Sequence, residues 1–337
     1  MNLEELGERG VIDRITRKFT VNKALIPVGA GEDDCAVIDL EKVRGGHRFL
    51  VVTTDTLLES RHLPAGITPF QMGWSAVAVN LSDIAAMGAH PFAITIALGL
   101  PGGTDLAFVD ELTEGIEACA AAYETAVVGG DMTRSTELML TGTCFGFATN
   151  PVRRAGAKVG DLICVTGSLG NAALALKAIT GEIALPEHAA ELVKRALLQP
   201  QPRIQEGIAI AHSGVATAMM DISDGLALSL ADIAQRSRVG VEVYEEAVPI
   251  LSEELRAEGD LKLSALELRE LAFYCGGDYE LLVTIDPQAG DDAAVLRTLR
   301  NAVKLTVIGK VVPAERGLSI RRGSESEQLE IRGYQHF

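Results

Sequence analysis

Apolar residues recur every three or four positions within residues 68–88. They are Trp74, Val77, Leu81 and Ile84. This spacing predicts a helix with one face in the core, with Thr68 as N-cap, Pro69 as its first residue and Gly88 at its end. Asp83 lies at the edge of the apolar stripe, where a carboxylate needs hydrogen bonds or a cation to stay charged. On this segment alone, Asp83 is either a functional residue or a structural one bonded to backbone N–H groups.

The other patterns in the first half predict strands and helices around this helix. We expect helices at 3–19 and 105–124, and strands at 35–38, 49–54, 91–100, 126–128 and 137–148. Two of these strands end in the acidic segments Thr53-Thr54-Asp55 and Gly129-Gly130-Asp131. The order of the elements predicts an α/β (α+β) fold in which mixed sheets have helices packed on one face.

Asn150-Pro151 and the basic loop after it, which includes Arg154, mark a domain boundary. We therefore expect two domains, 1–149 and 150–337, as the length of 337 residues also favours. In the second domain the patterns predict strands at 161–166, 216–220, 281–285, 305–312 and 318–321, and helices after Gly170, after Pro202, at 226–236 and at 291–301.

The composition narrows the class of protein. Hydrophobic residues make up 47% and aromatic residues 4%, with 34 glycines, which suits an α/β enzyme better than a coiled coil or a disordered chain. A net charge of −16 argues against nucleic acid or an anionic membrane as a partner. The five cysteines show no C-x-x-C spacing, and the N-terminus does not resemble a signal peptide. We expect a cytoplasmic protein with reduced thiols.

Seven aspartates share an unusual kind of position: strand ends, glycine turns or the apolar helix. They are Asp33, Asp34, Asp55, Asp83, Asp131, Asp221 and Asp224. Any one of them could be a capping or turn residue, but seven together favour a shared role. Converging carboxylates repel one another unless a cation neutralises them, and Mg²⁺ is typically held by a few carboxylates and by substrate phosphates. Thr53 and Thr54 add oxygen ligands, and the nearby glycines let backbone N–H groups approach phosphate.

The widely used phosphate and nucleophile motifs are absent from the sequence. There is no G-x-x-x-x-G-K-[ST] loop, no dinucleotide fingerprint and no kinase catalytic loop, and Ser168 lacks the glycine spacing of a nucleophile elbow. Arg154 is either a surface arginine or a phosphate clamp. His62, taken alone, is more often a surface or core histidine than a ligand. The residues by themselves therefore predict a metal-dependent phosphate site and leave its substrate open.

Several longer blocks resemble those of the thiamine-monophosphate kinases, a family of the aminoimidazole ribonucleotide synthetase-like superfamily. The blocks are 32–36, 53–57, 80–89, 129–131, 154–158, 221–225, 276–281 and 333–337. The resemblance covers nearly the whole chain. It implies a homodimer joined through its N-terminal half, which also binds ATP and Mg²⁺. It further implies a transferase of thiamine biosynthesis, a kinase that moves the γ-phosphoryl group of ATP directly to thiamine monophosphate and yields thiamine diphosphate.

The resemblance also implies roles for residues at matching positions. The implied Mg²⁺ ligands are Asp34, Thr53, Thr54, Asp55, Asp83, Asp131, Asp221 and Asp224. The implied ATP contacts are Gly130, Asp131, Arg154 and Ser223, and the implied thiamine monophosphate contacts are His62 and Tyr334. The catalytic candidates are therefore Asp55, Asp83, Asp131 and Arg154.

Two positions depart from the family pattern. Gly277 stands where the family has a glutamate that resembles a substrate contact, so Asp278 becomes the acceptor candidate and Glu280 the alternative. Glu32 stands where a glycine usually precedes the paired acids. Two other functions stay open: an ATP-dependent enzyme of the same superfamily with another acceptor, and a non-catalytic nucleotide-binding or regulatory homologue.

Overall fold

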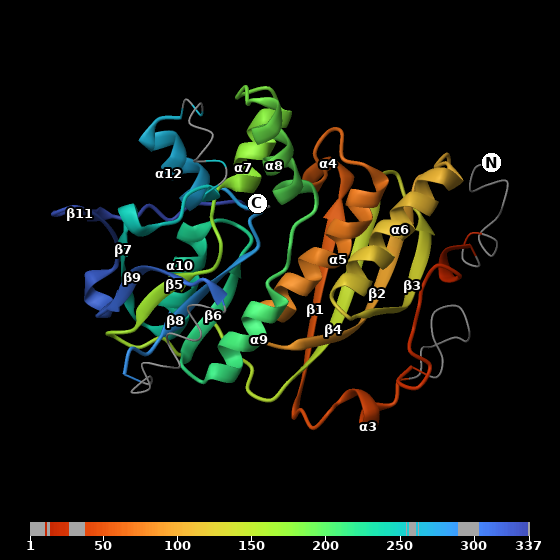
Figure 1. Ribbon diagram of the computed structural model, residues 1–337, viewed down its shortest axis with the longest axis horizontal. Coiled ribbons are helices and arrows are strands. Elements are labelled where there is room, and N and C mark those ends of the chain that lie inside the picture. Colours follow the sequence, from red (N-terminus) through yellow and green to blue (C-terminus); the bar gives the residue numbers. More distant parts are fainter. Residues whose placement is uncertain are drawn as a thin grey trace. The chain divides into compact units, whose positions relative to one another are not determined.

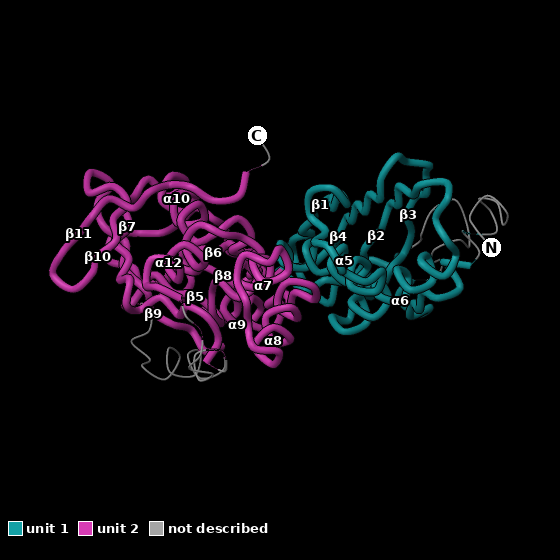
Figure 2. The backbone as a smooth tube through the Cα atoms, turned by 90° about the horizontal axis from the view of Figure 1, so that it is seen from above, with its two compact units in different colours: residues 1–84, 89–149 teal, residues 85–88, 150–337 magenta. Residues whose placement is uncertain are grey.

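The computed structural model describes residues 11, 14–26, 38–253, 255, 261, 263–288 and 303–335. Figure 1 shows the helices and strands along the chain. Figure 2 shows its division into two compact units. Unit 1 contains residues 1–84 and 89–149, and unit 2 contains residues 85–88 and 150–337.

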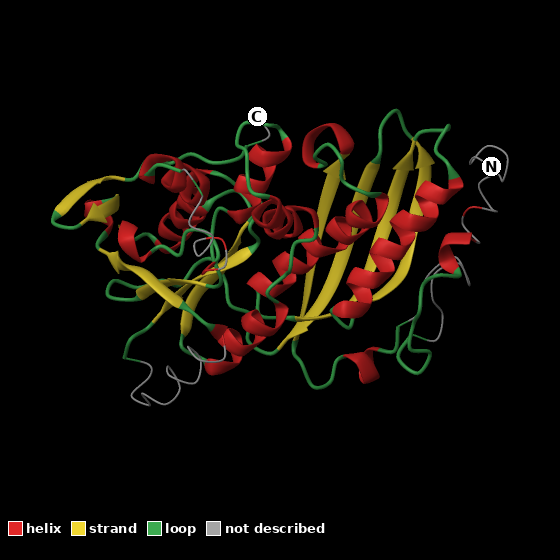
Figure 3. Ribbon diagram, turned by 45° about the horizontal axis from the view of Figure 1, so that its top comes forward, coloured by secondary structure: helices red, strands yellow, loops and turns green. Residues whose placement is uncertain are grey.

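Unit 1 is built on a four-stranded sheet with strand order β1-β4-β2-β3. The strands are β1 (Phe49–Leu58), β2 (His90–Leu100), β3 (Ala126–Arg134) and β4 (Met139–Ala148). β4 is antiparallel to β1 and β2, whereas β2 and β3 are parallel, so the sheet is mixed. Helices α5 (Pro69–Ala86) and α6 (Leu106–Ala122) lie against one face of this sheet (Figure 3). The one-turn helices are α3 (Leu40–Val43) and α4 (Glu59–His62).

Helix α5 forms where its capping residues and apolar spacing predict it. The Thr68 hydroxyl accepts a hydrogen bond from the Gln71 N–H, and the Gln71 side chain accepts one from the Thr68 N–H. This reciprocal pair is a capping box. Leu81 and Ile84 are fully buried. The helix stops before Gly88, whose φ of +63° is typical of a residue that follows a helix end.

Two glycines bring α5 and α6 into close contact. A Cβ atom at Gly73 would lie 2.0 Å from the carbonyl oxygen of Leu112, and a Cβ atom at Gly115 would lie 1.9 Å from that of Phe70. Both distances are far below van der Waals contact, so the backbone of each helix rests directly on the other. The contact fixes α5, the helix that carries Asp83.

Two strands of unit 1 are longer than predicted. The predicted ends were residues 54 and 128, but β1 has 10 residues and β3 has 9. Asp55 and Asp131 therefore lie within strands rather than at strand ends. Strand β1 continues through its polar segment because threonine, which is β-branched, favours strands. Thr56 also pairs across the sheet with Thr141 on β4, with 2.9 Å between their hydroxyl oxygens.

Unit 2 contains a seven-stranded mixed sheet with strand order β11-β10-β7-β9-β5-β8-β6. The β10–β7 pair is parallel and the other pairs are antiparallel. The strands are β5 (Leu162–Val165), β6 (Ala216–Ile222), β7 (Gly240–Tyr244), β8 (Glu280–Ile285), β9 (Thr306–Val312), β10 (Leu318–Arg322) and β11 (Glu325–Gln328). The mixed sheets of both units confirm the predicted α/β class.

The helices of unit 2 include three that the sequence patterns predict and two that they miss. The predicted ones are α7 (Asn171–Ile179), α9 (Ile204–Ser213) and α10 (Leu226–Ser237). The missed ones are α8 (Glu187–Leu198) and α12 (Ala265–Tyr274), and two short 3-10 helices span Glu245–Ala247 and Ala314–Arg316. The predicted helix at 291–301, most of the one at 3–19 and most of the strand at 35–38 lie outside the described residues.

In the part of the chain that the structure describes, no helix is both long enough and apolar enough to cross a membrane. The thiols of Cys119, Cys144 and Cys164 are buried, and that of Cys275 is half-buried. Burial raises the pKa of the Cys144 thiol to about 12, so this side chain is an uncharged core residue at neutral pH.

The α5–α6 contact predicts that a larger side chain at either glycine lowers the stability of unit 1. Gly115→Ala should lower the free energy of unfolding of unit 1 by about 1–3 kcal/mol, because the methyl group would overlap the Phe70 carbonyl. Gly103→Ala is the matched control, since no atom lies within 4 Å of the position that its Cβ would take. Urea unfolding followed by Trp74 fluorescence measures both variants. Equal midpoints for the two would contradict the proposed packing.

Candidate functional site

Asp83 projects from α5 toward strand β1 of the same unit. The Thr53 hydroxyl donates a hydrogen bond of 2.5 Å to Asp83 Oδ2. One turn earlier, the fully buried Asn80 accepts a hydrogen bond of 3.1 Å from the Asp55 N–H and donates one of 2.9 Å to the Ala76 carbonyl. These bonds hold the polar edge of α5 against the strand that carries Thr53 and Asp55. They give the half-buried Asp83 a fixed direction.

Thr54 and Asp131 do not share the sheet face on which Asp83 lies. Side chains alternate between the two faces along a strand, so Thr54 is directed away from the side that carries Thr53 and Asp55. Its hydroxyl donates a hydrogen bond of 2.7 Å to a main-chain carbonyl of β4. Asp131 belongs to the neighbouring cross-strand row, which consists of Thr56, Thr141, Ala97 and Asp131. The structure thus gathers three of the predicted residues of unit 1 and sets two apart.

His62 and Gly130 both have structural roles in unit 1. His62 ends α4, and its Nδ1 accepts a hydrogen bond of 2.9 Å from the Leu58 N–H at the beginning of that helix. A neutral ring that accepts at Nδ1 carries its proton on Nε2. At Gly130, a Cβ atom would lie 1.9 Å from the carbonyl oxygen of Ile96 on the neighbouring strand. Packing alone therefore requires glycine at this position.

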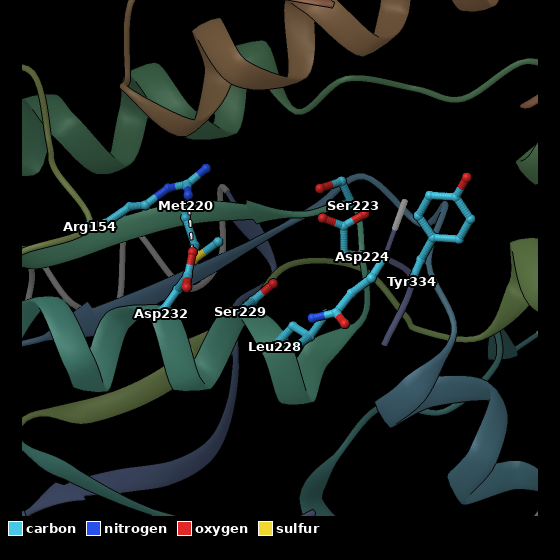
Figure 4. Close-up of a pocket in the computed structure, with 9 residues that line it drawn as sticks. Arg154, Met220, Ser223, Asp224, Leu228, Ser229, Asp232 and Tyr334 are labelled. Carbon is cyan, nitrogen blue, oxygen red and sulfur yellow. Dashed lines mark hydrogen bonds and ion pairs between the residues drawn. The ribbon is translucent and has the colours of Figure 1, made fainter. Parts of the chain in front are cut away.

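A pocket of unit 2 brings together four of the residues predicted from the sequence. Arg154, Ser223, Asp224 and Tyr334 line a cavity of about 440 Å³, together with Met220, Leu228, Ser229, Asp232 and Gln335. Figure 4 shows the Arg154 guanidinium at one end of this pocket and the Tyr334 ring at the other, with Ser223 and Asp224 between them. A cation, two polar side chains and an aromatic ring can together bind a ligand that carries both phosphate and a ring system.

Arg154 is held through both its side chain and its main chain. Its Nη1 lies 3.1 Å from Asp232 Oδ2 in an exposed ion pair, drawn as a dashed line in Figure 4. The Ser237 hydroxyl at the end of α10 donates to the Arg154 carbonyl, and it accepts from the N–H groups of Gly156 and Ala157. Exposed ion pairs contribute little stability, so a phosphate can replace Asp232 at small cost.

The turn at residues 223–225 is bound by two distant segments. The Gly277 N–H donates a hydrogen bond of 2.8 Å to the Ser223 carbonyl, and the Tyr334 N–H donates one of 3.0 Å to the Asp224 carbonyl. Gly225 opens α10 with a φ of +107°, a conformation that side chains other than that of glycine rarely adopt. This turn therefore positions the pocket and both segments that border it.

Asp278, predicted as a substrate contact, binds the N-terminus of α7. Its carboxylate accepts hydrogen bonds from the Gly170 N–H (2.7 Å) and the Ala172 N–H (3.2 Å). It thereby serves as a helix cap from a distant part of the sequence, since α7 has no side-chain cap of its own. Burial, opposed by the backbone N–H donors and reinforced by the charge of Glu280, raises the pKa of Asp278 to about 7.

The departure at Gly277 has a structural cause. Its φ of +97° lies in the region that favours glycine, and a Cβ atom there would lie 3.2 Å from the Ala172 side chain. A glutamate would need a different backbone at this turn. The alternative acceptor residue, Glu280, is bound within unit 2 by the Arg203 guanidinium (2.5 and 2.7 Å) and by the Thr166 hydroxyl (2.7 Å).

The remaining predicted metal ligands are distributed over the chain. Asp221 is buried in β6, opposite Leu281 of β8. Asp34 lies outside the described residues. Over the described ranges, no three His, Cys, Asp or Glu side chains gather closely enough to form a metal site by themselves. Mg²⁺ is commonly held by only one or two protein carboxylates together with substrate phosphates. The oxygen atoms of Thr53, Asp55 and Asp83 therefore fit an Mg²⁺ ion that substrate phosphates would also bind.

Sequence reasoning missed two of the residues that build the pocket region, Asp232 and Ser237. The sequence could have indicated Asp232. It follows Asp224 and Leu228 at intervals of four residues, and the segment after Gly225 was predicted to be helical, so these positions would share one helix face. Ser237 gave no such signal. Its hydroxyl contacts a loop some 80 positions earlier in the sequence, and only the fold brings the two together.

The fold and the pocket define an AIR synthase related protein. The N-terminal domain model of that class matches residues 32–148, and the C-terminal domain model matches residues 158–320. A thiamine-monophosphate kinase from Methanospirillum hungatei is 40% identical over 306 residues, which cover 90% of this chain and 92% of that protein. The chain belongs to the thiamine-monophosphate kinase family.

Solved structures support this assignment. Thiamine-monophosphate kinase from Stenotrophomonas maltophilia K279a is 35% identical, with a TM-score of 0.78 over 92% of this chain and 95% of that chain. AaThiL complexed with AMPPCP and TMP is 30% identical, with a TM-score of 0.75 over 100% of this chain and 99% of that chain.

Proposed function

We propose that this protein transfers the γ-phosphoryl group of ATP to thiamine monophosphate and forms thiamine diphosphate. The observation that carries the proposal is the pocket that joins Arg154, Ser223, Asp224 and Tyr334, in a chain of the thiamine-monophosphate kinase family. A solved relative of 30% identity holds AMPPCP and TMP. In this pocket Arg154 and Ser223 would contact the nucleotide phosphates. In unit 1, the main chain of Gly130 is a separate proposed nucleotide contact.

Mg²⁺ is the metal ion that best suits the oxygen donors of this chain. Thr53, Asp55 and Asp83 share one face of unit 1 and would provide its ligands. Asp34, Thr54, Asp131, Asp221 and Asp224 are the further proposed ligands, of which Thr54 and Asp131 lie on the other sheet face and could serve only a different ion. When bound, Mg²⁺ would neutralise phosphate charge during transfer. Thr53 contributes by orienting the Asp83 carboxylate, and Asn80 holds the Asp55 segment in place.

The acceptor needs no general base. A phosphate monoester has its second pKa at about 6, so the attacking oxygen is largely anionic at neutral pH. The obstacle is the repulsion between two polyanions, which Arg154 reduces by neutralising charge during direct in-line transfer. Tyr334 would offer its ring to the thiamine moiety. In unit 1, His62 is a separate proposed acceptor contact through Nε2. Asp278 acts on the acceptor site indirectly, by fixing the 276–279 turn against α7.

A turnover assay tests the proposed reaction. Purified protein incubated with ATP, Mg²⁺ and thiamine monophosphate should form thiamine diphosphate, detected by chromatography after oxidation to the thiochrome. Omission of Mg²⁺, and replacement of thiamine monophosphate by thiamine, are the controls. Tight Mg-ATP binding without any product would contradict the proposal and favour a non-catalytic nucleotide-binding homologue. Turnover with a different acceptor only would favour another enzyme of the superfamily.

Asp83→Asn should lower kcat by about 100-fold or more, because the change removes a charge that would hold the metal ion. Its fold should persist, since the amide oxygen of the substituted side chain can still accept the Thr53 hydrogen bond. Asp105→Asn is the matched control, because it removes the same charge from the N-cap of α6, where asparagine caps equally well, and it should retain activity within about twofold. Circular dichroism checks the fold of both variants. Full activity in Asp83→Asn would leave Asp83 a structural residue.

We propose that the protein is a homodimer joined through the sheet face of unit 1 that α5 and α6 leave uncovered. Leu50 and Val52 of β1 are 55% and 52% exposed on that face, so it presents neighbouring apolar side chains of the kind that an interface covers. Light scattering after size exclusion should give twice the chain mass of 35.7 kDa. Val52→Glu should give the monomer mass, whereas Leu266→Glu on α12 should leave the dimer intact. A wild-type monomer would contradict the proposal.

A further inference from the structure

The segment that carries Tyr334 is fastened to α12 by one arginine. Arg332 makes a bidentate ion pair with Glu270, with 2.5 Å from Nη1 to Oε1 and 2.5 Å from Nη2 to Oε2. Its guanidinium carbon also lies 3.6 Å from the centroid of the Tyr274 ring. Two parallel charge-assisted hydrogen bonds and a cation–π contact fix both the position and the plane of the guanidinium.

Immediately after Arg332 the chain passes over the turn that borders the pocket. A Cβ atom at Gly333 would lie 2.3 Å from the Asp224 carbonyl oxygen, so the backbone rests directly on the turn. The next residue, Tyr334, donates its N–H to the same carbonyl, and its side chain lines the pocket. The arginine and the tyrosine are therefore two residues apart, and the backbone between them lies against the turn.

We propose that Arg332 is a positioning residue whose clamp on Glu270 and Tyr274 holds Tyr334 in the pocket for the acceptor. The inference rests on the proposed function, in which the Tyr334 ring contacts thiamine monophosphate. Residues 329–335 contain neither helix nor strand, so the direction of the tyrosine depends on such local anchors. The buried Leu329, whose N–H donates to the Leu318 carbonyl, provides the anchor on the other side of Arg332.

Three variants separate positioning from general stability. Arg332→Ala removes both contacts, and Arg332→Lys keeps a cation beside Tyr274 but cannot form the bidentate pair. Arg322→Ala is the matched control, because Arg322 makes a comparable pair with Glu245 (2.8 and 3.1 Å), on β10 and away from the pocket.

Two measurements on the full-length protein decide the proposal. Hydrogen–deuterium exchange of peptides that span 329–335 should become faster in Arg332→Ala, because the Tyr334 N–H loses its protection, and it should stay unchanged in Arg322→Ala. In steady-state kinetics Arg332→Ala should raise KM for thiamine monophosphate about tenfold, with kcat and KM for ATP within about twofold, and Arg332→Lys should fall between.

The outcomes distinguish this inference from the proposed function. Unchanged exchange of 329–335 in Arg332→Ala would overturn the clamp, whether or not the protein is a kinase. Faster exchange with an unchanged KM for thiamine monophosphate would overturn the role of the clamp in holding the acceptor. Equal losses in Arg332→Ala and Arg322→Ala would assign both arginines to general stability. Failure of the wild-type protein to form product would refute the proposed function, and the exchange data would still decide the clamp.

Discussion

The pocket of unit 2 depends on the turn at residues 223–225, because two backbone carbonyls there bind segments that are far apart in the sequence. The Ser223 carbonyl accepts from Gly277 and the Asp224 carbonyl accepts from Tyr334. Backbone groups cannot be replaced by mutation, so the constraint falls on the residues that approach them. A Cβ atom at Gly276 or at Gly333 would overlap a carbonyl oxygen of this turn. Close backbone contact at this turn thus explains both glycine-containing blocks.

In unit 1 the main constraint is to hold the Asp83 carboxylate at the edge of an apolar helix. Asn80 is fully buried and satisfies its amide through one bond to strand β1 and one to its own helix. Thr53 then donates to the carboxylate of Asp83. The glycine contacts between α5 and α6 set the position of this helix against its neighbour. Packing and hydrogen bonds together therefore set the direction of the Asp83 carboxylate.

The sequence predicted best what local chemistry decides. Helix α5 has a cap, an apolar period and a glycine stop, and all three agree with the structure. The ends of β1 and β3 were wrong because threonines and an acid in β1, and two glycines and an acid in β3, resemble a turn until the partner strand is known. The pocket residues Arg154, Ser223 and Tyr334 came from the family resemblance, since no periodicity relates positions so far apart. The capping role of Asp278 was out of reach for the same reason.

The position of Tyr334 in the chain has a consequence for biosynthesis. The pocket needs Arg154, the turn at 223–225 and Tyr334 at once, and a ribosome makes them in that order. Strand β6, which leads into the turn, pairs with β8, and β8 pairs with β5, so the framework of the pocket also waits for residues 280–285. The complete pocket therefore exists only after synthesis has passed residue 334, so a ligand that needs all of its walls cannot stabilise the chain before then.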